Sequence, residues 1–200
     1  MAPLLRIKSL SALRLTAMTE GYLGFRALRI VSSDRCLFDR WIWLFPLAFA
    51  VHFLEEVNGF PDWVNKVLGG QSTMFGFIVS NAVFMAILVS LCLNAKRAGT
   101  RGATLLLFAW VAAQQFGNFI FHFWAQIAFS TYSPGVVSAT LIYYPTFLAV
   151  GYVAVRDKHL SLRSFLVCTV LGFPAMVLFA WANIYRFGTI PWANWIGTLQ

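Results

Sequence analysis

The chain has 200 residues, of which 60% are hydrophobic and 11% are charged, and it contains 20 Phe and 8 Trp. Soluble domains carry about 25% charged residues, so this composition excludes an ordinary soluble domain and indicates a membrane protein. The apolar segments are roughly 20 residues long and do not alternate with polar residues, which excludes a membrane β-barrel.

Residues 1–35 precede the first apolar segment and form a basic extension rich in Arg, Leu and Ser. They lack the long apolar core and the small-residue cleavage site of a secretory signal. We expect this extension to lie on the inner membrane surface or to be disordered. A transit peptide, and a translation start at Met18, stay open as alternatives.

Residues 36–200 are expected to form one all-α domain, a polytopic membrane bundle of five transmembrane helices. Each segment holds about the 20 mostly apolar residues that a bilayer-spanning helix needs. The last four contain no acidic or basic residue before Arg186. The spans are predicted at about 41–58, 74–93, 103–126, 135–155 and 164–186. Pro145 is expected to kink the fourth of them, because proline removes a backbone donor.

The 15 Lys and Arg residues are distributed unevenly around these spans. Thirteen lie before the first span, in loop 94–102 or in loop 156–163, whereas Lys66 and Arg186 lie on the other side. By the positive-inside rule, this asymmetry predicts a cytoplasmic N-terminus and a C-terminus outside. The charge therefore orients the chain in a membrane, and no nucleic-acid partner is expected. Trp192 and Trp195, just past the last span, are typical interfacial anchors.

This orientation predicts the result of a reporter-fusion experiment. A reporter fused after Gln200 should be extracytoplasmic, and a reporter inserted in loop 94–102 should be cytoplasmic, because basic loops are retained inside. Finding both reporters on the same side would contradict the five-span topology.

The first span carries polar side chains that a lipid-facing helix would not tolerate, in the sequence VHFLEE at 51–56. His52, Glu55 and Glu56 have the i, i+3, i+4 spacing that places side chains on one helix face. An ionised carboxylate near the middle of a membrane helix costs about 2.5–3.5 kcal/mol, so two of them nearly cancel the insertion energy of this span. Their helix must therefore find partners for them or protonate at least one.

The third span supplies candidate partners. Gln114, Asn118 and His122 recur every four residues and form one polar stripe on an otherwise apolar helix. At about 1.5 Å per residue, Glu56 and Asn118 each lie roughly 22 Å from the start of their span. We therefore expect Asn118 and His122 to lie within hydrogen-bonding or shared-metal distance of Glu55 or Glu56. Other polar residues expected near this layer are Asn81, Tyr144, Asn183 and Arg186.

The pattern His52-x-x-Glu55-Glu56 in the first of five spans, with Asn118-x-x-x-His122 two spans later, resembles the HXXEE-motif family of bacterial integral membrane proteins. The resemblance covers about residues 36–186. It implies a multi-pass protein of the bacterial inner membrane. Because the family has no assigned activity, the chemistry has to be inferred from the residues.

These residue types favour an intramembrane enzyme that acts on a lipid or isoprenoid-like substrate. The expected catalytic residues are His52, Glu55, Glu56, Asn118 and His122. Of these, His52, Glu56 and His122 are ligand types for Zn²⁺ or Fe²⁺, and three such ligands leave a position open for the water of a metal-assisted hydrolysis. A metal-free alternative pairs a buried Glu with a His for acid–base chemistry. In that version a carbocation would be supported by Trp110, Trp124 or Trp181.

Two other classes of function stay open: a small proton-coupled transporter that uses the same carboxylates, and a non-catalytic partner of another membrane protein. Five spans cannot form the equal inverted repeats of many transporters. Intramembrane amides also serve to pack helices together, which is our expectation for Gln114, Gln115 and Asn81. Cys92 and Cys168 are expected to pack as small apolar side chains. The pattern does not predict an oligomeric state.

Overall fold

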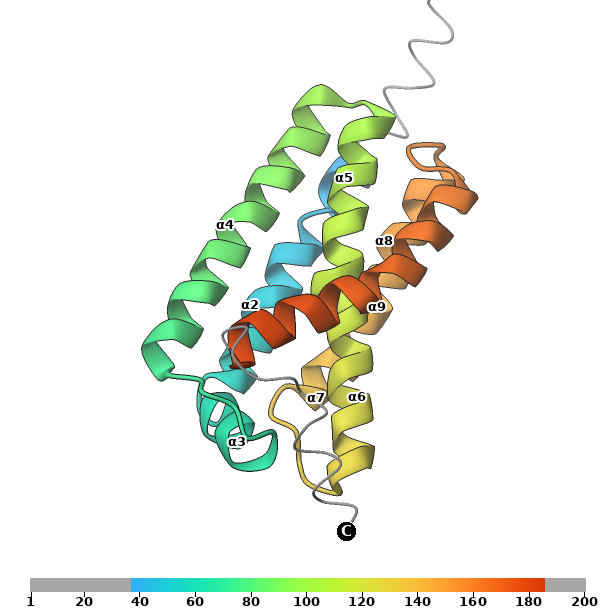
Figure 1. The fold of residues 1–200 in the computed structure, drawn as a ribbon. Coiled ribbons are helices and arrows are strands. Elements are labelled where there is room, and N and C mark those ends of the chain that lie inside the picture. Colours follow the sequence, from blue (N-terminus) through green and yellow to red (C-terminus); the bar gives the residue numbers. More distant parts are fainter. Residues whose placement is uncertain (1–36, 186–200) are drawn as a thin grey trace, which may run out of the picture.

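The computed structural model describes residues 37–185, and every element in that range is a helix (Figure 1). The predicted N-terminal extension, Cys36, Arg186, Trp192 and Trp195 lie outside the described residues, as does the side chain of Asn183. A helical turn at 37–41 comes first. The helices that follow are α2 (Leu44–Glu56), α3 (Phe60–Val67), α4 (Met74–Ala98), α5 (Arg101–Val111), η1 (Ala112–Gly117), α6 (Asn118–Phe129), α7 (Val136–Ser138), η2 (Ala139–Tyr143), α8 (Tyr144–Arg156) and α9 (Leu162–Tyr185).

Five helical stretches in the described residues are long and apolar enough to cross a membrane, which is the predicted number. They run over Leu37–Glu56, Met74–Ala98, Arg101–Phe129, Val136–Arg156 and Leu162–Ala182. The second is longer than predicted because Lys96 and Arg97 join its last turn, where a basic side chain suits the negative end of the helix dipole. The first ends at Glu56, so its carboxylates lie in the last turn and not near the middle of the span.

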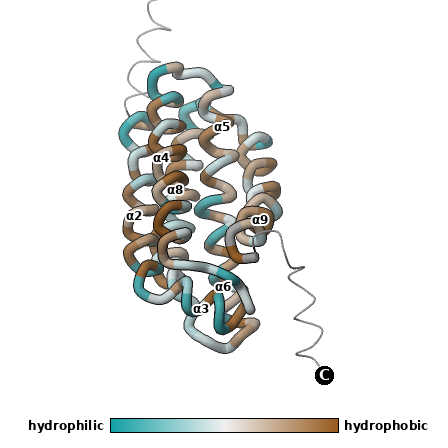
Figure 2. Tube along the Cα trace, turned by 60° about the vertical axis from the view of Figure 1, so that its left-hand side comes forward, coloured by the Kyte–Doolittle hydropathy of each residue, from teal (hydrophilic) through white to brown (hydrophobic). Residues whose placement is uncertain are grey.

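The third span is the most buried of the five, and α4 and α9 lie on the outside. In an 18-residue apolar stretch of each span, 50% of the residues are buried in the third span, against 11% in the second and in the fifth. In Figure 1, α4 runs beside α5, and α9 crosses the third span obliquely, where it packs against η1 and α5. Figure 2 shows hydrophobic residues along the length of the helices. Many large apolar side chains are exposed, among them Phe75 at 79%. An apolar outer surface of this kind suits a lipid environment.

Aromatic side chains join the helices in the core. Phe108 of α5 meets Phe45 of α2 edge to face, with ring centroids 5.8 Å apart, and lies 6.2 Å from Phe147 of α8. Cys92 and Cys168 are free and buried, at 0% and 6% exposure, which confirms that they pack as small apolar side chains.

Two of the spans contain π-helical turns, which the sequence did not predict. In the third span, η1 brings the backbone against α9: a Cβ on Gly172 would lie 2.4 Å from the carbonyl oxygen of Ala112, so only glycine permits this approach. In the fourth span, η2 ends directly before α8, and Pro145 falls in the first turn of α8, where its missing N–H is tolerated. Such turns are often found at functional sites.

The short helix α3 was not predicted, because its eight residues are too few for a helical period to be recognised against the flanking spans. Pro61 lies in its first turn and Trp63 and Val64 are buried on one face. The segment after α3 is held by a hydrogen bond from Gln71 N to Ile184 O of α9, 2.8 Å long.

The basic loops and the short helices lie at opposite ends of the bundle. Figure 1 shows the α4–α5 and α8–α9 connections at the upper end and α3 and α7 at the lower end. The predicted cytoplasmic loops thus share one end of the molecule, while the orientation of that end in a membrane stays a prediction.

Candidate metal centre

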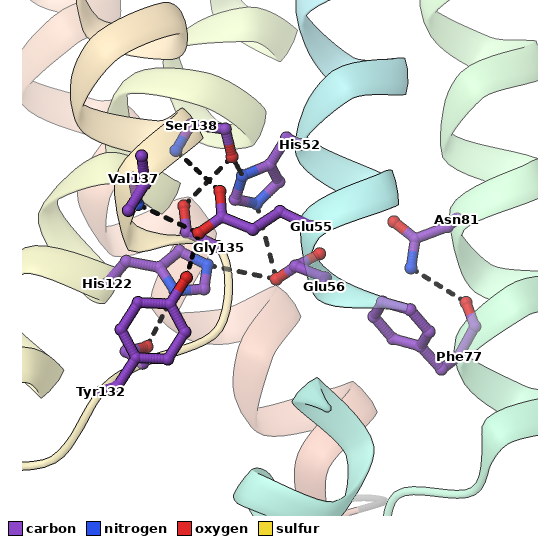
Figure 3. A network of polar contacts seen from close by, with 11 residues as sticks. His52, Glu55, Glu56, Phe77, Asn81, His122, Tyr132, Gly135, Val137 and Ser138 are labelled. Atoms are coloured by element: carbon purple, nitrogen blue, oxygen red, sulfur yellow. Dashed lines mark hydrogen bonds and ion pairs between the residues drawn. The ribbon is translucent and has the colours of Figure 1, made fainter. Parts of the chain in front are cut away.

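A cluster of two histidines and one glutamate lies where α2, α6 and the start of the fourth span meet (Figure 3). His52 and Glu56 come from the last two turns of α2, one turn apart, and His122 comes from α6. All three side chains are buried, with exposures of 1%, 4% and 0%. His52 Nε2 lies 3.4 Å and His122 Nε2 lies 3.2 Å from the same oxygen, Oε1 of Glu56.

These separations are those expected around a metal ion. Bonds of about 2.0–2.2 Å in tetrahedral geometry place neighbouring ligand atoms roughly 3.3–3.6 Å apart. One ligand atom from each of His52, Glu56 and His122 lies within 4.8 Å of the other two. Neither Nε2 atom has a hydrogen-bond partner within the described residues. The cluster therefore offers three converging ligand atoms, two of which are not engaged elsewhere.

Two serines hold the imidazole rings at Nδ1, the ring nitrogen that does not face Glu56. Nδ1 of His52 lies 2.9 Å from Oγ of Ser138, and Nδ1 of His122 lies 2.9 Å from Oγ of Ser133. The Ser138 hydroxyl is also 3.3 Å from the carbonyl oxygen of Gly135, and when it donates to that oxygen it accepts from Nδ1–H of His52. In this tautomer the lone pair of Nε2 faces the Glu56 carboxylate and is available to a cation, whereas in the other tautomer Nε2–H faces Glu56.

Gly135 closes the cluster on the side of the fourth span. Its φ of +102° falls in the region that favours glycine. A Cβ at this position would lie 2.8 Å from Cε1 of both His52 and His122, and 3.0 Å from Cγ of Glu56. The ring of Tyr143 packs against the ring of His52, with the two ring centroids 4.3 Å apart. The cluster is thus enclosed by backbone and by aromatic surface.

The neighbouring carboxylate, Glu55, has different partners. It accepts hydrogen bonds from the Tyr132 hydroxyl at 2.5 Å, from Val137 N at 3.2 Å and from Ser138 N at 2.7 Å (Figure 3). Burial and the bond to Glu55 raise the pKa of Tyr132 to about 12, so its hydroxyl stays protonated and keeps donating. Backbone N–H groups at the start of a helix favour a carboxylate. Glu55 therefore ties the end of α2 to the start of the fourth span.

A cavity of about 250 Å³ adjoins the cluster and is lined by residues of α2, α3, α4, α9 and the third span. His52 and Glu56 reach its wall, and so do Gln114 and Asn118 of the third span. Most of the other lining side chains are aromatic or aliphatic. The cluster can thus be approached from a mostly apolar space, which is how ligand sites are usually built.

Residues 43–150 match the family described as "Protein of unknown function with HXXEE motif". The chain belongs to this HXXEE family. The match begins later and ends earlier than the range of 36–186 expected from the motif, and it leaves out α9. No curated protein and no solved structure matches the chain. All three residues of the cluster lie inside the family match, whereas α9 adds one wall of the cavity from outside it.

Several predictions about the motif can now be compared with the structure. The first and third spans converge as predicted, since His122 and Glu56 are in contact. Asn118 shares the cavity with Glu56, and its Oδ1 has no hydrogen-bond partner within the described residues. Glu55 does not join the cluster, because residues 55 and 56 are about 100° apart around a helix and reach different neighbours. That any of these residues is catalytic stays a prediction.

The other polar residues singled out in the sequence have different surroundings in the structure. Asn81 lines the cavity and bonds to Phe77 O of its own helix, whereas Tyr144 is 38% exposed and stacks on Phe119, away from the cluster. The packing role expected for Gln115 is confirmed by its bond to Phe45 O, 2.9 Å long. The same expectation for Gln114 is wrong for the part of the chain that the structure describes, where neither Nε2 nor Oε1 of its amide group has a hydrogen-bond partner.

Sequence reasoning missed Ser133, Gly135, Ser138 and Tyr143. Ser-Pro-Gly at 133–135 is an ordinary turn signal, and nothing local distinguishes a serine that orients a histidine from one that ends a loop. The one available hint was position: this turn precedes the fourth span at the end of the bundle where Glu56 ends the first.

Proposed function

We propose that the protein is a membrane-embedded, metal-dependent enzyme in which His52, Glu56 and His122 hold one Zn²⁺ or Fe²⁺ ion beside a cavity for a lipid-like substrate. The observation that carries the proposal is the convergence of His52 Nε2 and His122 Nε2 on one oxygen of Glu56, at 3.4 and 3.2 Å. Two histidines and a glutamate are a ligand set of catalytic zinc sites, which keep a further position open.

The reaction class that suits this arrangement is hydrolysis of a bond between a carbonyl carbon and its leaving group. A divalent ion held here would polarise a carbonyl and lower the pKa of a bound water towards 7. The protein would contribute the fixed imidazoles, since Ser138 and Ser133 hold both Nδ1 atoms, and a low-polarity wall that limits bulk water. Glu55 would act as a positioning residue through Ser138, whose backbone it binds.

The distribution of charge favours this proposal over a proton-coupled transporter. In the spans that the structure describes, all Asp, Glu, Lys and Arg residues, Glu55 and Glu56 included, lie in the terminal turns. No relay of ionisable groups therefore leads from the cluster across the described bundle, as proton transport would require.

Elemental analysis of gently purified protein tests the proposal. We expect about one Zn or Fe per chain. His122→Ala should lose the metal, and His159→Ala, which removes the histidine that stacks on Phe38 outside the cluster, should retain it. A folded wild-type protein without any transition metal would move the proposal to the metal-free acid–base version, in which Glu56 and a histidine exchange a proton.

A further inference from the structure

The cavity beside the cluster contains polar groups that the protein itself does not satisfy. Gln114 is 7% exposed and lines the cavity, and within residues 37–185 neither its Nε2 nor its Oε1 has a hydrogen-bond partner. Asn118 Oδ1 and Trp110 Nε1 line the same cavity and are also without partners within the described residues. Buried polar groups are nearly always hydrogen-bonded, so a donor and an acceptor on one amide without partners indicate a missing molecule.

The position of Gln114 is fixed by the fold. It lies in η1, onto which Gly172 lets α9 pack directly, and the next residue, Gln115, is held by Phe45 O. Two adjacent glutamines thus have separate roles, one between helices and one in the cavity. A π-helical turn placed beside a cavity is a common feature of functional sites.

The charge and size of the cavity restrict the molecule. Among the described residues that line it there is no Lys or Arg, and Glu56 is the one carboxylate. In the metal-free protein an anionic head group would therefore meet the charge of Glu56 and no Lys or Arg among these residues. The volume of about 250 Å³ exceeds the roughly 150 Å³ that accommodates one benzene, so the cavity accommodates a polar group with the first part of one chain, and the rest of a longer chain would lie outside it. Phenylalanines such as Phe77 and Phe121 supply the apolar walls.

We infer that the cavity binds an uncharged, single-chain amphiphile whose polar group both donates and accepts a hydrogen bond, as a fatty amide does, with Gln114 pairing with that group. An amide matches both atoms of the Gln114 side chain, whereas an ester or a carboxylate matches its donor alone, and in the metal-free protein a carboxylate is also repelled by Glu56. The inference refines the substrate class of the proposed function. That the bound molecule is a substrate rests on the proposed function, whereas its binding in the cavity does not require the metal.

Thermal unfolding of the detergent-solubilised protein, after its metal has been removed with a chelator, tests this inference with three probes of equal chain length. Oleamide should raise the Tm saturably and bind at least about 10-fold more tightly than methyl oleate or oleate at pH 7. Gln114→Leu should remove this preference and raise the Tm of the ligand-free protein, because a buried amide without partners is replaced by an apolar side chain of similar size. The metal content of Gln114→Leu should equal that of the wild type.

Equal or tighter binding of oleate, or an unchanged preference in Gln114→Leu, would overturn the inference. Absence of saturable binding by all three probes would mean that the cavity holds water only, which would overturn it as well. Glu56→Gln separates this inference from the proposed function, since the variant should lose the metal and still bind oleamide. A wild-type protein that is purified with metal but binds no oleamide once the metal is removed refutes the inference alone, and one that binds oleamide but is purified without metal refutes the metal centre alone.

Discussion

Glu56→Gln is expected to abolish metal retention, whereas the same replacement at the adjacent Glu55 is not. Glu56 supplies the one charged ligand atom, on which Nε2 of His52 and Nε2 of His122 both converge. The amide of Gln has nearly the same shape but no charge and a much weaker donor oxygen. We expect metal affinity to fall by more than about 100-fold, beyond the 10–100-fold that is typical when a residue behind the ligands is lost.

Glu55→Gln is the matched control for this experiment. Glu55 binds Tyr132 and two backbone N–H groups and has no contact with the two histidines. Its replacement should loosen Ser138 and with it the orientation of His52, which lowers metal affinity by about 10-fold but leaves metal in the purified protein. Metal content measured side by side decides the assignment: equal loss in the two variants, or retention in Glu56→Gln, would contradict the roles given to the two glutamates.

The second large effect is expected at Gly135, where a single methyl group should disrupt the cluster. The Cβ of Gly135→Ala would lie 2.8 Å from the rings of His52 and His122, with φ at +102°. Overpacking costs about 1–3 kcal/mol and a strained backbone a further 1–3 kcal/mol, so the free energy of unfolding should fall by roughly 2–6 kcal/mol. Metal should be lost as well, because the rings cannot keep their positions.

Gly102→Ala provides the control for Gly135→Ala. Gly102 lies in the first turn of α5, and a Cβ there would meet nothing within 4 Å. Because Ala has the higher helix propensity, this variant should be neutral or more stable by up to about 1 kcal/mol. Chemical unfolding in detergent and elemental analysis of the two variants give the comparison. If Gly135→Ala were as stable and as metal-rich as Gly102→Ala, the close packing of the fourth span over the cluster would be refuted.

The different roles of Glu55 and Glu56 cannot be read from the linear sequence motif. In the sequence the two carboxylates are neighbours with the same chemistry, and both were expected to be catalytic. In the structure one meets two histidines and the other meets the first backbone N–H groups of the fourth span. The rotation of about 100° between successive helical residues points the two side chains in different directions. The elements on each side then determine which groups each carboxylate meets.

The sequence by itself determined the all-helical class, the five apolar spans and the convergence of the first and third spans, because insertion into lipid requires long apolar helices and penalises a carboxylate without partners. It also predicted that His52, Glu56 and His122 could hold a metal ion, and these are the residues that the structure brings together. The tertiary structure alone decided that Ser133 and Ser138 orient the rings, that Gly135 closes over them, and that Gln114 faces a cavity while Gln115 joins two helices. These features depend on contacts between residues far apart in the chain and on π-helical turns that shift the helix face, and neither leaves a local pattern in the sequence.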